Sequence, residues 1–261
     1  MILVMSPRKI EIFGLEDFPE IEEGDDIGAL ILSLAERQGV GVEDGDIVVV
    51  AQKIVSKAEG RVVKLRDVEP SREAERIGEA TGRDERLVEL VLREAVRVVK
   101  AGRDALIVET RNGRICLNAG IDKSNIHGED SYVLLPLDPD SSARRIRERI
   151  FELSGKRVGV IVSDTTSRPF RRGQVDMAIG VAGLHPFRDY RGERDRAGYT
   201  LKVKYISIAD EVASAAELVM GQGREGVPVA LVRGIEFIED EQPSSKSLNV
   251  SKEIDLFKDT L

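Results

Sequence analysis

Apolar positions recur along the chain at two different spacings, which together predict a mixture of helices and strands. Between Asp25 and Gln38, apolar residues return every three or four positions, at Ile27, Leu30, Ile31 and Leu34. This is the period of a helix with one buried face. Short runs of β-branched residues at 47–50 and 158–162 instead predict buried strands.

The same patterns predict the remaining elements. Two helices are predicted over 71–100, broken at Thr81-Gly82, with further helices from a capped start at 138–141 to about residue 153 and over 209–220. Further strands are predicted at 8–13, 114–118, 201–208 and 227–232, and an acidic loop at 14–23.

Helices and strands mix without strict alternation, so the sequence favours an α+β fold over a doubly wound sheet. We expect mixed sheets with flanking helices. Residues 1–261 are expected to form a single catalytic unit with a polar C-terminal tail at 240–261. We place any division into two subdomains near 135–140.

Composition and charge exclude several classes of protein. The 261 residues are 41% hydrophobic and 33% charged, as in a globular protein with a sizeable core. The net charge is −8 at pH 7, whereas nucleic-acid-binding proteins usually carry a basic excess, so no nucleic-acid partner is expected. The short apolar start, Met1 to Met5, fits neither a signal peptide nor a membrane span.

The cysteine and histidine content points to no metal or disulfide framework. Cys116 is the sole cysteine, so no internal disulfide can form and a reducing, cytoplasmic location is expected. Its strand-like surroundings favour a small buried residue over a nucleophile. The two histidines, His127 and His185, lack metal-ligand spacing and are expected to be structural.

An apolar strand that ends in Ser-Asp-Thr is the first segment able to carry chemistry. Asp164 and Thr165 end the strand, and Arg168, Arg171 and Arg172 follow. Strand ends often open into crevices, and carboxylate and hydroxyl oxygens suit hard cations such as Mg²⁺ or Mn²⁺. The arginines suit a phosphate or carboxylate. The alternative is a helix or turn cap at Asp164 beside a solvated basic face.

Two further segments carry polar side chains. The loop from Asn118 to Asn125 contains Asp122. It can hold a cation or a ribose, or it can be a turn whose Asp and Asn side chains bond their own backbone. Lys53 and Lys57 lie an even number of residues apart, so in a strand they share one face. That face suits either a phosphate or solvent.

Residues 221–226 match the pattern G-x-G-x-x-G literally. The match follows a predicted helix and precedes a strand, which is the reverse of the dinucleotide-binding order, so we reject that interpretation. The glycines still let backbone N–H groups approach a phosphate, and an ordinary helix-ending loop is the alternative. No G-x-x-x-x-G-K-[ST] segment occurs, which excludes an ordinary P-loop.

Taken in order, five motifs give the chain a resemblance to a known family. They are Glu-Gly-Asp-Asp at 23–26, Ser-Lys-Ala-Glu-Gly-Arg at 56–61, Asn-Ala-Gly-Ile-Asp at 118–122, Ser-Asp-Thr at 163–165 with Arg-Pro-Phe-Arg-Arg-Gly at 168–173, and Met-Gly-Gln-Gly at 220–223. The ordered set resembles the coenzyme F420-0:L-glutamate ligase family over nearly the whole chain.

The resemblance implies a GTP-dependent amide ligase in coenzyme F420 biosynthesis. In that family's reaction, GTP activates the terminal carboxylate of coenzyme F420-0 as an acyl phosphate, and the amine of L-glutamate displaces the phosphate. A second glutamate is then added through a γ-linkage. The resemblance also implies an intertwined homodimer, two divalent cations (Mg²⁺ or Mn²⁺) and a monovalent cation such as K⁺.

Site residues are carried over by motif. Asp122 and Asp164 are expected to be catalytic and to bind one divalent ion, and Thr165 and Gln222 to form the site of the second. Since the Gln222 amide is a neutral ligand, the second ion is expected to bind more weakly than it would to a carboxylate at this position. The nucleotide is expected to contact Phe18, Pro19, Glu20, Ile21, Gln52, Lys53, Lys57, Asn125, Gly221 and Gly223. Arg168, Arg171 and Arg172 are expected to bind the anionic precursor.

Two other functions remain open. One is a related amide ligase with a different carboxylate acceptor, such as a pterin. The other is a non-catalytic regulator that binds GTP and metal. Consumption of GTP separates an enzyme from a regulator, and the identity of the acceptor separates the two ligases.

Overall fold

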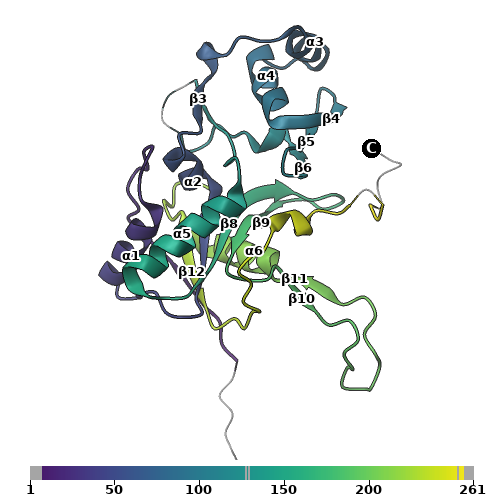
Figure 1. The fold of residues 1–261 in the computed structure, drawn as a ribbon. Helices are drawn as coiled ribbons and strands as arrows, with labels where there is room; N and C mark the ends of the chain where they lie inside the picture. The colour runs from purple at the N-terminus through teal and green to yellow at the C-terminus, as the bar shows by residue number, and fades with distance from the viewer. Residues whose placement is uncertain (1–7, 127, 129, 252, 256–261) are drawn as a thin grey trace, which may run out of the picture. The chain divides into compact units, whose positions relative to one another are not determined.

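The computed structural model describes residues 8–126, 128, 130–251 and 253–255, and Figure 1 shows its elements. The backbone forms two compact units. Unit 1 consists of the described part of Met1–Glu20 with Asp26–Ala51 and Pro139–Ser245. Unit 2 consists of Ile21–Asp25, Gln52–Asp138 and the described part of Lys246–Leu261.

A five-stranded sheet with the order β1-β12-β2-β8-β9 forms the centre of unit 1. Its strands are β1 (Glu11–Gly14), β2 (Ile47–Ala51), β8 (Gly159–Ser167), β9 (Gln174–Ala182) and β12 (Val229–Arg233). β2 and β8 run parallel, and the other three pairs are antiparallel. Residues 47–50 and 159–163 are buried, which explains why these strands read as continuous apolar runs.

The helices of unit 1 pack on this sheet. They are α1 (Ile27–Arg37), α5 (Pro139–Ser154) and α6 (Ile208–Met220). α5 packs against β8 and β9, α6 against β9 and β12, and α1 against α5. The Asp26 carboxylate accepts from Ala29 N–H at 3.0 Å and from Arg149 Nε at 2.6 Å. One aspartate therefore caps α1 and joins it to α5.

A two-stranded hairpin also belongs to unit 1. β10 (Phe187–Asp189) pairs with β11 (Tyr205–Ser207), and the rings of Phe187 and Tyr205 stack with their centroids 4.3 Å apart. This ring pair stabilises the base of the hairpin.

Unit 2 combines helices with two small sheets. The helices are α2 (Gln52–Ala58), α3 (Arg72–Thr81) and α4 (Glu85–Glu94). One sheet contains β4 (Ala95–Ala101), β5 (Leu106–Thr110) and β6 (Ile115–Leu117), and the other β3 (Val62–Lys64) and β7 (Ser131–Val133). Apolar side chains of α3, α4 and β5, including Ile77, Val91 and Val108, pack into a common core.

Local sequence signals set the ends of these helices. The side chains of Ser71 and Asp84 cap the starts of α3 and α4, and Gly82 ends α3 with a left-handed φ of 71°. Short 3-10 turns complete the described elements: η1 (Leu65–Asp67), η2 (Asn118–Gly120) and η3 (Ser245–Leu248).

The predicted α+β class, with mixed sheets and flanking helices, is confirmed. The helix predicted to continue to residue 100 is wrong, because α4 ends at Glu94 and residues 95–101 form β4. β-branched residues at 96, 98 and 99 pair β4 with β5, and this pairing outweighs the helical spacing.

Two other predictions of regular structure are corrected. The strand predicted at 201–208 shortens to Tyr205–Ser207, because the preceding residues make irregular loop contacts: Leu201 N–H donates to the Glu193 carbonyl and Tyr190 N–H to the Lys204 carbonyl. Lys53 and Lys57 lie in helix α2 rather than in a strand. They still share a face, because residues four apart are neighbours on a helix.

Cys116 lies in β6 as predicted, but it is half-buried rather than buried, since β6 is an edge strand. In the part of the chain that the structure describes, no helix is both long and apolar enough to span a membrane.

Candidate functional site

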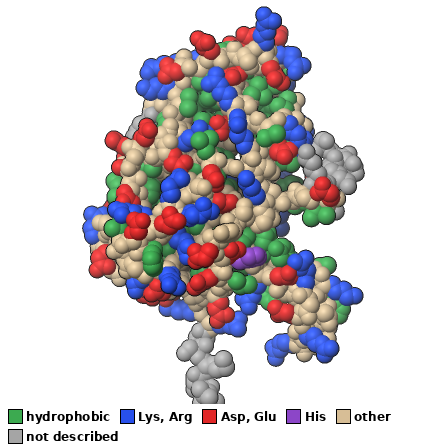
Figure 2. Space-filling model, in the orientation of Figure 1, with side chains coloured by type: hydrophobic (Ala, Val, Ile, Leu, Met, Phe, Trp, Pro, Cys, Tyr) green, Lys and Arg blue, Asp and Glu red, His purple; other side chains and the backbone are tan. Residues whose placement is uncertain are grey.

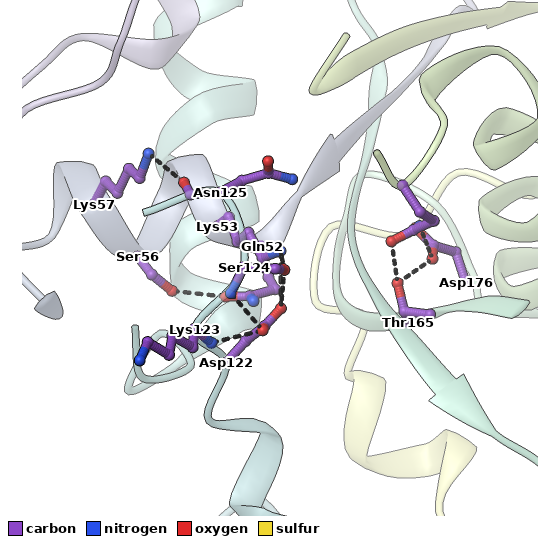
Figure 3. Close-up of polar contacts among 11 residues, drawn as sticks. Gln52, Lys53, Ser56, Lys57, Asp122, Lys123, Ser124, Asn125, Thr165 and Asp176 are labelled. Carbon is purple, nitrogen blue, oxygen red and sulfur yellow. Dashed lines mark hydrogen bonds and ion pairs between the residues drawn. The ribbon is translucent and has the colours of Figure 1, made fainter. Parts of the chain in front are cut away.

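Two clusters of polar side chains, one in each unit, contain several of the predicted site residues, and Figure 3 shows part of each at close range. In unit 2, the lysine–aspartate cluster consists of Lys53, Lys57, Asp122, Ser124 and Asn125. In unit 1, the threonine–aspartate cluster consists of Ser163, Thr165, Asp176 and Gln222.

An ion pair between Lys53 and Asp122 forms the centre of the lysine–aspartate cluster. Lys53 Nζ lies 2.8 Å from Asp122 Oδ2 and donates to Ser124 Oγ at 2.5 Å. Asp122 Oδ1 accepts the backbone N–H groups of Lys123 at 2.6 Å and Ser124 at 2.8 Å. The aspartate therefore bonds its own turn, as the turn interpretation predicts, and also holds the lysine.

These contacts lower the pKa of the Asp122 carboxyl group below its ordinary value. Partial burial favours the neutral acid, but the hydrogen bond and charge of Lys53 and the N–H of Ser124 outweigh it. Asp122 is therefore ionised at neutral pH. Its negative charge is available to balance either an ammonium group or a metal ion.

Helix α2 directs both lysines toward the loop at 122–125. Lys53 and Lys57 are one helical turn apart, and Lys57 Nζ donates to the Asn125 carbonyl at 3.1 Å. Asn125 has a left-handed φ of 55°, a conformation that asparagine adopts more readily than most residues. Two ammonium groups therefore contact one short loop, where an incoming phosphate would meet both.

Gln52 starts α2 but faces inward. The residue is 3% exposed, and its Oε1 accepts from Ser56 Oγ at 2.9 Å. In this position the side chain stabilises the first turn of the helix, and its contact with the nucleotide stays a prediction of the resemblance.

Asp176 is the residue that links the other side chains of the threonine–aspartate cluster. It lies directly opposite Thr165 across the β8–β9 pair. Its Oδ1 accepts from Thr165 Oγ1 at 2.8 Å and from Gln222 Nε2 at 3.0 Å, and its Oδ2 accepts from Ser163 Oγ at 3.0 Å. Gln222 Oε1 in turn lies 2.9 Å from Thr165 Oγ1. Three side chains, two from strand β8 and one from the loop after α6, thus meet at the Asp176 carboxylate.

Sequence reasoning missed Asp176, because strand β9 was not predicted. The sequence signal was the apolar run from Val175 to Ala182, which Asp176 interrupts; in the structure Asp176 and Ala178 are buried, and Val175 and Met177 are half-buried. An aspartate on the buried face of an alternating strand requires hydrogen-bond donors. The partner hydroxyls of Ser163 and Thr165 lie two residues apart on β8, on one face of that strand.

Asp164 lies between these two hydroxyl residues, so its side chain projects from the other face of β8. It pairs with Met177 inside the β8–β9 ladder, and its interpretation as a helix or turn cap is therefore wrong. Asp164 belongs to unit 1 and Asp122 to unit 2. Their sharing of one divalent ion stays a prediction.

The glycine-rich segment is a helix-ending loop. Gly221 follows α6 with a φ of 68°, and Gly223 N–H donates to Glu225 Oε2 at 2.7 Å. Ser214 Oγ of α6 donates to the backbone carbonyl of Asp176 at 2.7 Å. That bond fixes α6 to β9 and so brings the amide of Gln222, which is an exposed residue, within hydrogen-bond distance of the carboxylate.

The remaining predicted contact residues lie in loops of unit 1, except Ile21, with which the chain enters unit 2. Arg168 is half-buried and Arg171 and Arg172 are exposed in the β8–β9 turn. After β1, Phe18 is half-buried, Pro19 and Glu20 are exposed, and Ile21, the first residue of unit 2, is buried. Their roles in binding the precursor and the nucleotide stay predictions.

His185 lies outside both clusters. His185 Nδ1 lies 3.0 Å from the Phe187 carbonyl oxygen, a local contact of the kind expected of a structural histidine. His127 lies outside the described residues.

The threonine–aspartate cluster has the donor chemistry that a hard cation requires. Among the described residues, no three His, Cys, Asp or Glu side chains come together. The cluster instead offers one carboxylate with hydroxyl and amide oxygens, and such oxygens suit Mg²⁺ and Mn²⁺. Thr165 has one hydroxyl proton for two acceptor oxygens within 2.9 Å, so it can donate to only one of them at a time.

The first cluster brings lysines to a carboxylate-bearing loop and the second gathers hard oxygen donors, and these are the residue types suited to phosphate groups and to cations. The chain matches the family F420-0:γ-glutamyl ligase over residues 16–234, and it belongs to that family.

Curated relatives match along most of their length. The coenzyme F420:L-glutamate ligase of Methanothermobacter thermautotrophicus is 47% identical over 226 residues, covering 86% of this chain and 89% of the relative. The enzyme of the same name from Methanocaldococcus jannaschii is 44% identical over 232 residues, covering 89% and 90%. That of Methanosarcina mazei is 37% identical over 254 residues, covering 97% of each chain.

Proposed function

We propose that this protein is a GTP-dependent ligase that joins L-glutamate to the terminal carboxylate of coenzyme F420-0 in coenzyme F420 biosynthesis. Family membership carries the proposal. Relatives named coenzyme F420:L-glutamate ligase match 86% and 97% of this chain at 47% and 37% identity, respectively. The two polar clusters support it, because they supply the groups that phosphate activation of a carboxylate requires.

We assign the phosphates of GTP to the lysine–aspartate cluster. Lys53 and Lys57 present two ammonium groups to one loop, and lysines of this kind neutralise and orient a transferring phosphoryl group. Lys53 is paired with Asp122 at 2.8 Å, so a phosphate oxygen competes with that carboxylate for the ammonium group. Asp122 is then released to bind positive charge elsewhere.

The reaction itself has two steps. The carboxylate of F420-0 attacks the γ-phosphorus of GTP and the β–γ phosphoanhydride bond breaks. GDP is the leaving group, and F420-0 carries the transferred phosphoryl group as an acyl phosphate. The neutral amine of L-glutamate then attacks the acyl carbon, the carbon–oxygen bond to phosphate breaks, and an amide and inorganic phosphate result. The second glutamate is added by the same two steps on the γ-carboxylate of the first.

Asp122, Asp164, Thr165 and Gln222 are the residues that we propose hold two divalent cations. Such ions, when bound, neutralise charge on the phosphoryl oxygens. The chain's own part is to fix oxygen donors in place: the Asp122 turn and the β8–β9 ladder are both held by backbone hydrogen bonds. Rigid donors cost little reorganisation during the reaction.

The homodimer and the stimulation by K⁺ belong to the same proposal. Light scattering of the purified protein is expected to give twice the chain mass of 28.8 kDa. Replacement of K⁺ by Na⁺ is expected to lower turnover. An active species of single-chain mass would contradict the dimer.

The deciding experiment is incubation of the purified protein with F420-0, L-glutamate, GTP and Mn²⁺, with mass analysis of the product and measurement of GDP. We expect one and then two glutamyl additions, each coupled to one GDP. A product formed equally well without nucleotide contradicts the acyl-phosphate scheme. Glutamylation of a pterin carboxylate but not of F420-0 indicates the rival ligase, and GTP binding without consumption indicates a regulator.

A further inference from the structure

Asp176 is a carboxylate that none of the family motifs contains, yet it touches two of the proposed cation ligands. It is 3% exposed, and its three side-chain donors come from Ser163, Thr165 and Gln222. An ionised carboxylate only accepts hydrogen bonds, so it takes whatever donor group a neighbour has. Its effect on Thr165 and Gln222 therefore depends on which half of each side chain it binds.

Both neighbours have a donor half and an acceptor half. The Thr165 hydroxyl carries one proton and two lone pairs, and the Gln222 amide carries an NH₂ and a carbonyl oxygen. The proton of Thr165 can go to Asp176 Oδ1 at 2.8 Å or to Gln222 Oε1 at 2.9 Å, but not to both. The bond to the charged oxygen is the stronger.

The amide of Gln222 is oriented by the same atom. Its Nε2 donates to Asp176 Oδ1 at 3.0 Å, which turns Oε1 toward Thr165 Oγ1. Asp176 thus binds the donor halves of both side chains. When the Thr165 proton goes to Asp176, two acceptor oxygens, Thr165 Oγ1 and Gln222 Oε1, face each other at 2.9 Å, and a cation between them would stabilise that arrangement.

We propose that Asp176 is the positioning residue of the second cation site: it orients the Thr165 hydroxyl and the Gln222 amide so that their oxygens face a divalent cation. It also supplies the negative charge that these two neutral ligands lack. The inference rests on the proposed function for the identity of the two ligands, but its test does not require turnover.

The neighbouring elements are built to hold Asp176 still. Its Oδ2 is bonded to Ser163 at 3.0 Å and its backbone carbonyl to Ser214 of α6 at 2.7 Å. The first bond prevents the carboxylate from rotating away from Thr165. The second fixes the helix whose end carries Gln222. Ser163, Thr165 and Gln222 therefore all meet a carboxylate of fixed direction.

The test measures binding of Mn²⁺ by electron paramagnetic resonance, without nucleotide or substrate. Asp176→Asn keeps the shape but removes the charge, and it is expected to weaken binding of one Mn²⁺ by about 10-fold or more, since charged oxygens bind hard cations far better than neutral ones. Thr165→Val removes the oriented oxygen. If Asp176 acts through Thr165, the double variant loses no more affinity than the worse single variant.

A matched control separates positioning from folding. Asp46 is another buried aspartate of unit 1, 0% exposed and paired with Arg233. It lies beside Gly159, at the opposite end of β8, six residues or about 20 Å from Thr165 at about 3.3 Å per strand residue. Asp46→Asn is expected to lower the unfolding temperature and leave the Mn²⁺ dissociation constants unchanged.

The outcomes are distinct. If Asp176→Asn does not fold, Asp176→Ser replaces it, because serine is smaller, fits the same space and lacks the charge, and the same loss is expected. Wild-type Mn²⁺ affinity in either folded variant overturns the positioning role, as does strict additivity with Thr165→Val. Absence of Mn²⁺ binding by the wild-type protein also overturns it. Failure of glutamate ligation with Mn²⁺ binding intact contradicts the proposed function alone.

Discussion

The two polar clusters solve opposite electrostatic problems. In the lysine–aspartate cluster, the charge of Asp122 is balanced by an ammonium group at 2.8 Å and by two backbone N–H groups. In the threonine–aspartate cluster, the carboxylate of Asp176 is surrounded by neutral donors. The first cluster carries its own cation, whereas the carboxylate of the second has only neutral hydrogen-bond donors around it.

This difference indicates what each cluster binds. A paired lysine exchanges its carboxylate for a phosphate at little cost, because one anion replaces another. A buried carboxylate with neutral partners gains most from a cation, because it loses solvation without a compensating charge. Figure 2 shows that acidic and basic side chains are interspersed over the visible surface. Under the proposed function, we therefore expect ligand choice to depend on these local groups rather than on the net charge of −8.

The largest effect is expected from Asp164, the residue on the other face of β8. Asp164→Asn is expected to lower kcat about 10²-fold or more, since removal of one preorganised electrostatic group typically has this cost. The unfolding temperature should stay near that of the wild type, because the amide fits the same strand position. Steady-state kinetics of GDP release and a thermal melt measure the two quantities.

Asp189→Asn serves as the control for that variant. Asp189 is a surface aspartate of unit 1 paired with Arg191, and that pairing lowers its pKa to about 2. Its loss is expected to leave kcat unchanged. Near-normal activity in Asp164→Asn would mean that the second face of β8 has no part in the reaction.

A smaller effect is expected from Lys53 of the lysine–aspartate cluster. Lys53→Met is expected to raise the KM for GTP about 10-fold, which corresponds to about 1.4 kcal/mol of lost binding. Mn²⁺ affinity at the threonine–aspartate cluster should not change, because Lys53 makes its contacts in unit 2. Lys156→Met, which removes another half-buried lysine beside an aspartate, should change neither value. An unaltered KM in Lys53→Met contradicts the assignment of this cluster to phosphate.

How much of the fold and of the two clusters the sequence predicts depends on whether the sequence signal is local or depends on a distant pairing partner. Helix α1 and strands β2 and β8 were predicted because their apolar periods reflect local burial. β4 was not, because Ala95 to Ala101 has a spacing compatible with a helix and becomes a strand through pairing with β5. Local patterns contain no information on such a partner.

The site shows the same limit. Lys53, Asp122, Thr165 and Gln222 were named from motifs, and the structure brings Lys53 to Asp122 and Thr165 to Gln222. Asp176 was missed because its importance comes from its register opposite Thr165. That register depends on a β-bulge between Val162 and Ser163, and a shift of one residue would turn the carboxylate to the other face.

A third prediction sharpens the contrast by adding a negative charge to the threonine–aspartate cluster. Gln222→Glu puts a second carboxylate beside Asp176 and is expected to tighten binding of one Mn²⁺ several-fold, since the added charge attracts a hard cation. Activity then saturates at a lower Mn²⁺ concentration. A metal titration that superimposes on the wild-type curve would remove Gln222 from the site. Glu225→Gln, in the same loop, is the control and is expected to leave the metal affinity unchanged.

The smallest expected effect concerns the pH dependence of stability at the lysine–aspartate cluster. The pKa of Asp122 is lowered in the folded protein because the bonds and charge of Lys53 outweigh the effect of burial. A carboxyl group with a lowered folded pKa stabilises the fold above its unfolded pKa, which is about 3.9. That contribution is lost as the pH falls through the folded value.

Lys53→Met is therefore expected to destabilise the protein at neutral pH and to have less effect in acid. Since the Asp122 side chain is 40% exposed, solvent screening limits the difference to about 1 kcal/mol or less. Urea unfolding of the two proteins between pH 7 and pH 3 measures it. The difference in unfolding free energy should stay constant above about pH 5, a unit above the unfolded pKa, and shrink below that.

Lys156→Met should show little such trend, because the lowered pKa of its neighbour Asp44 comes first from the backbone N–H of Arg157, which the substitution retains. A difference for Lys53→Met that does not change with pH would mean that the lysine stabilises the loop through packing and its bond to Ser124 rather than through the charge of Asp122.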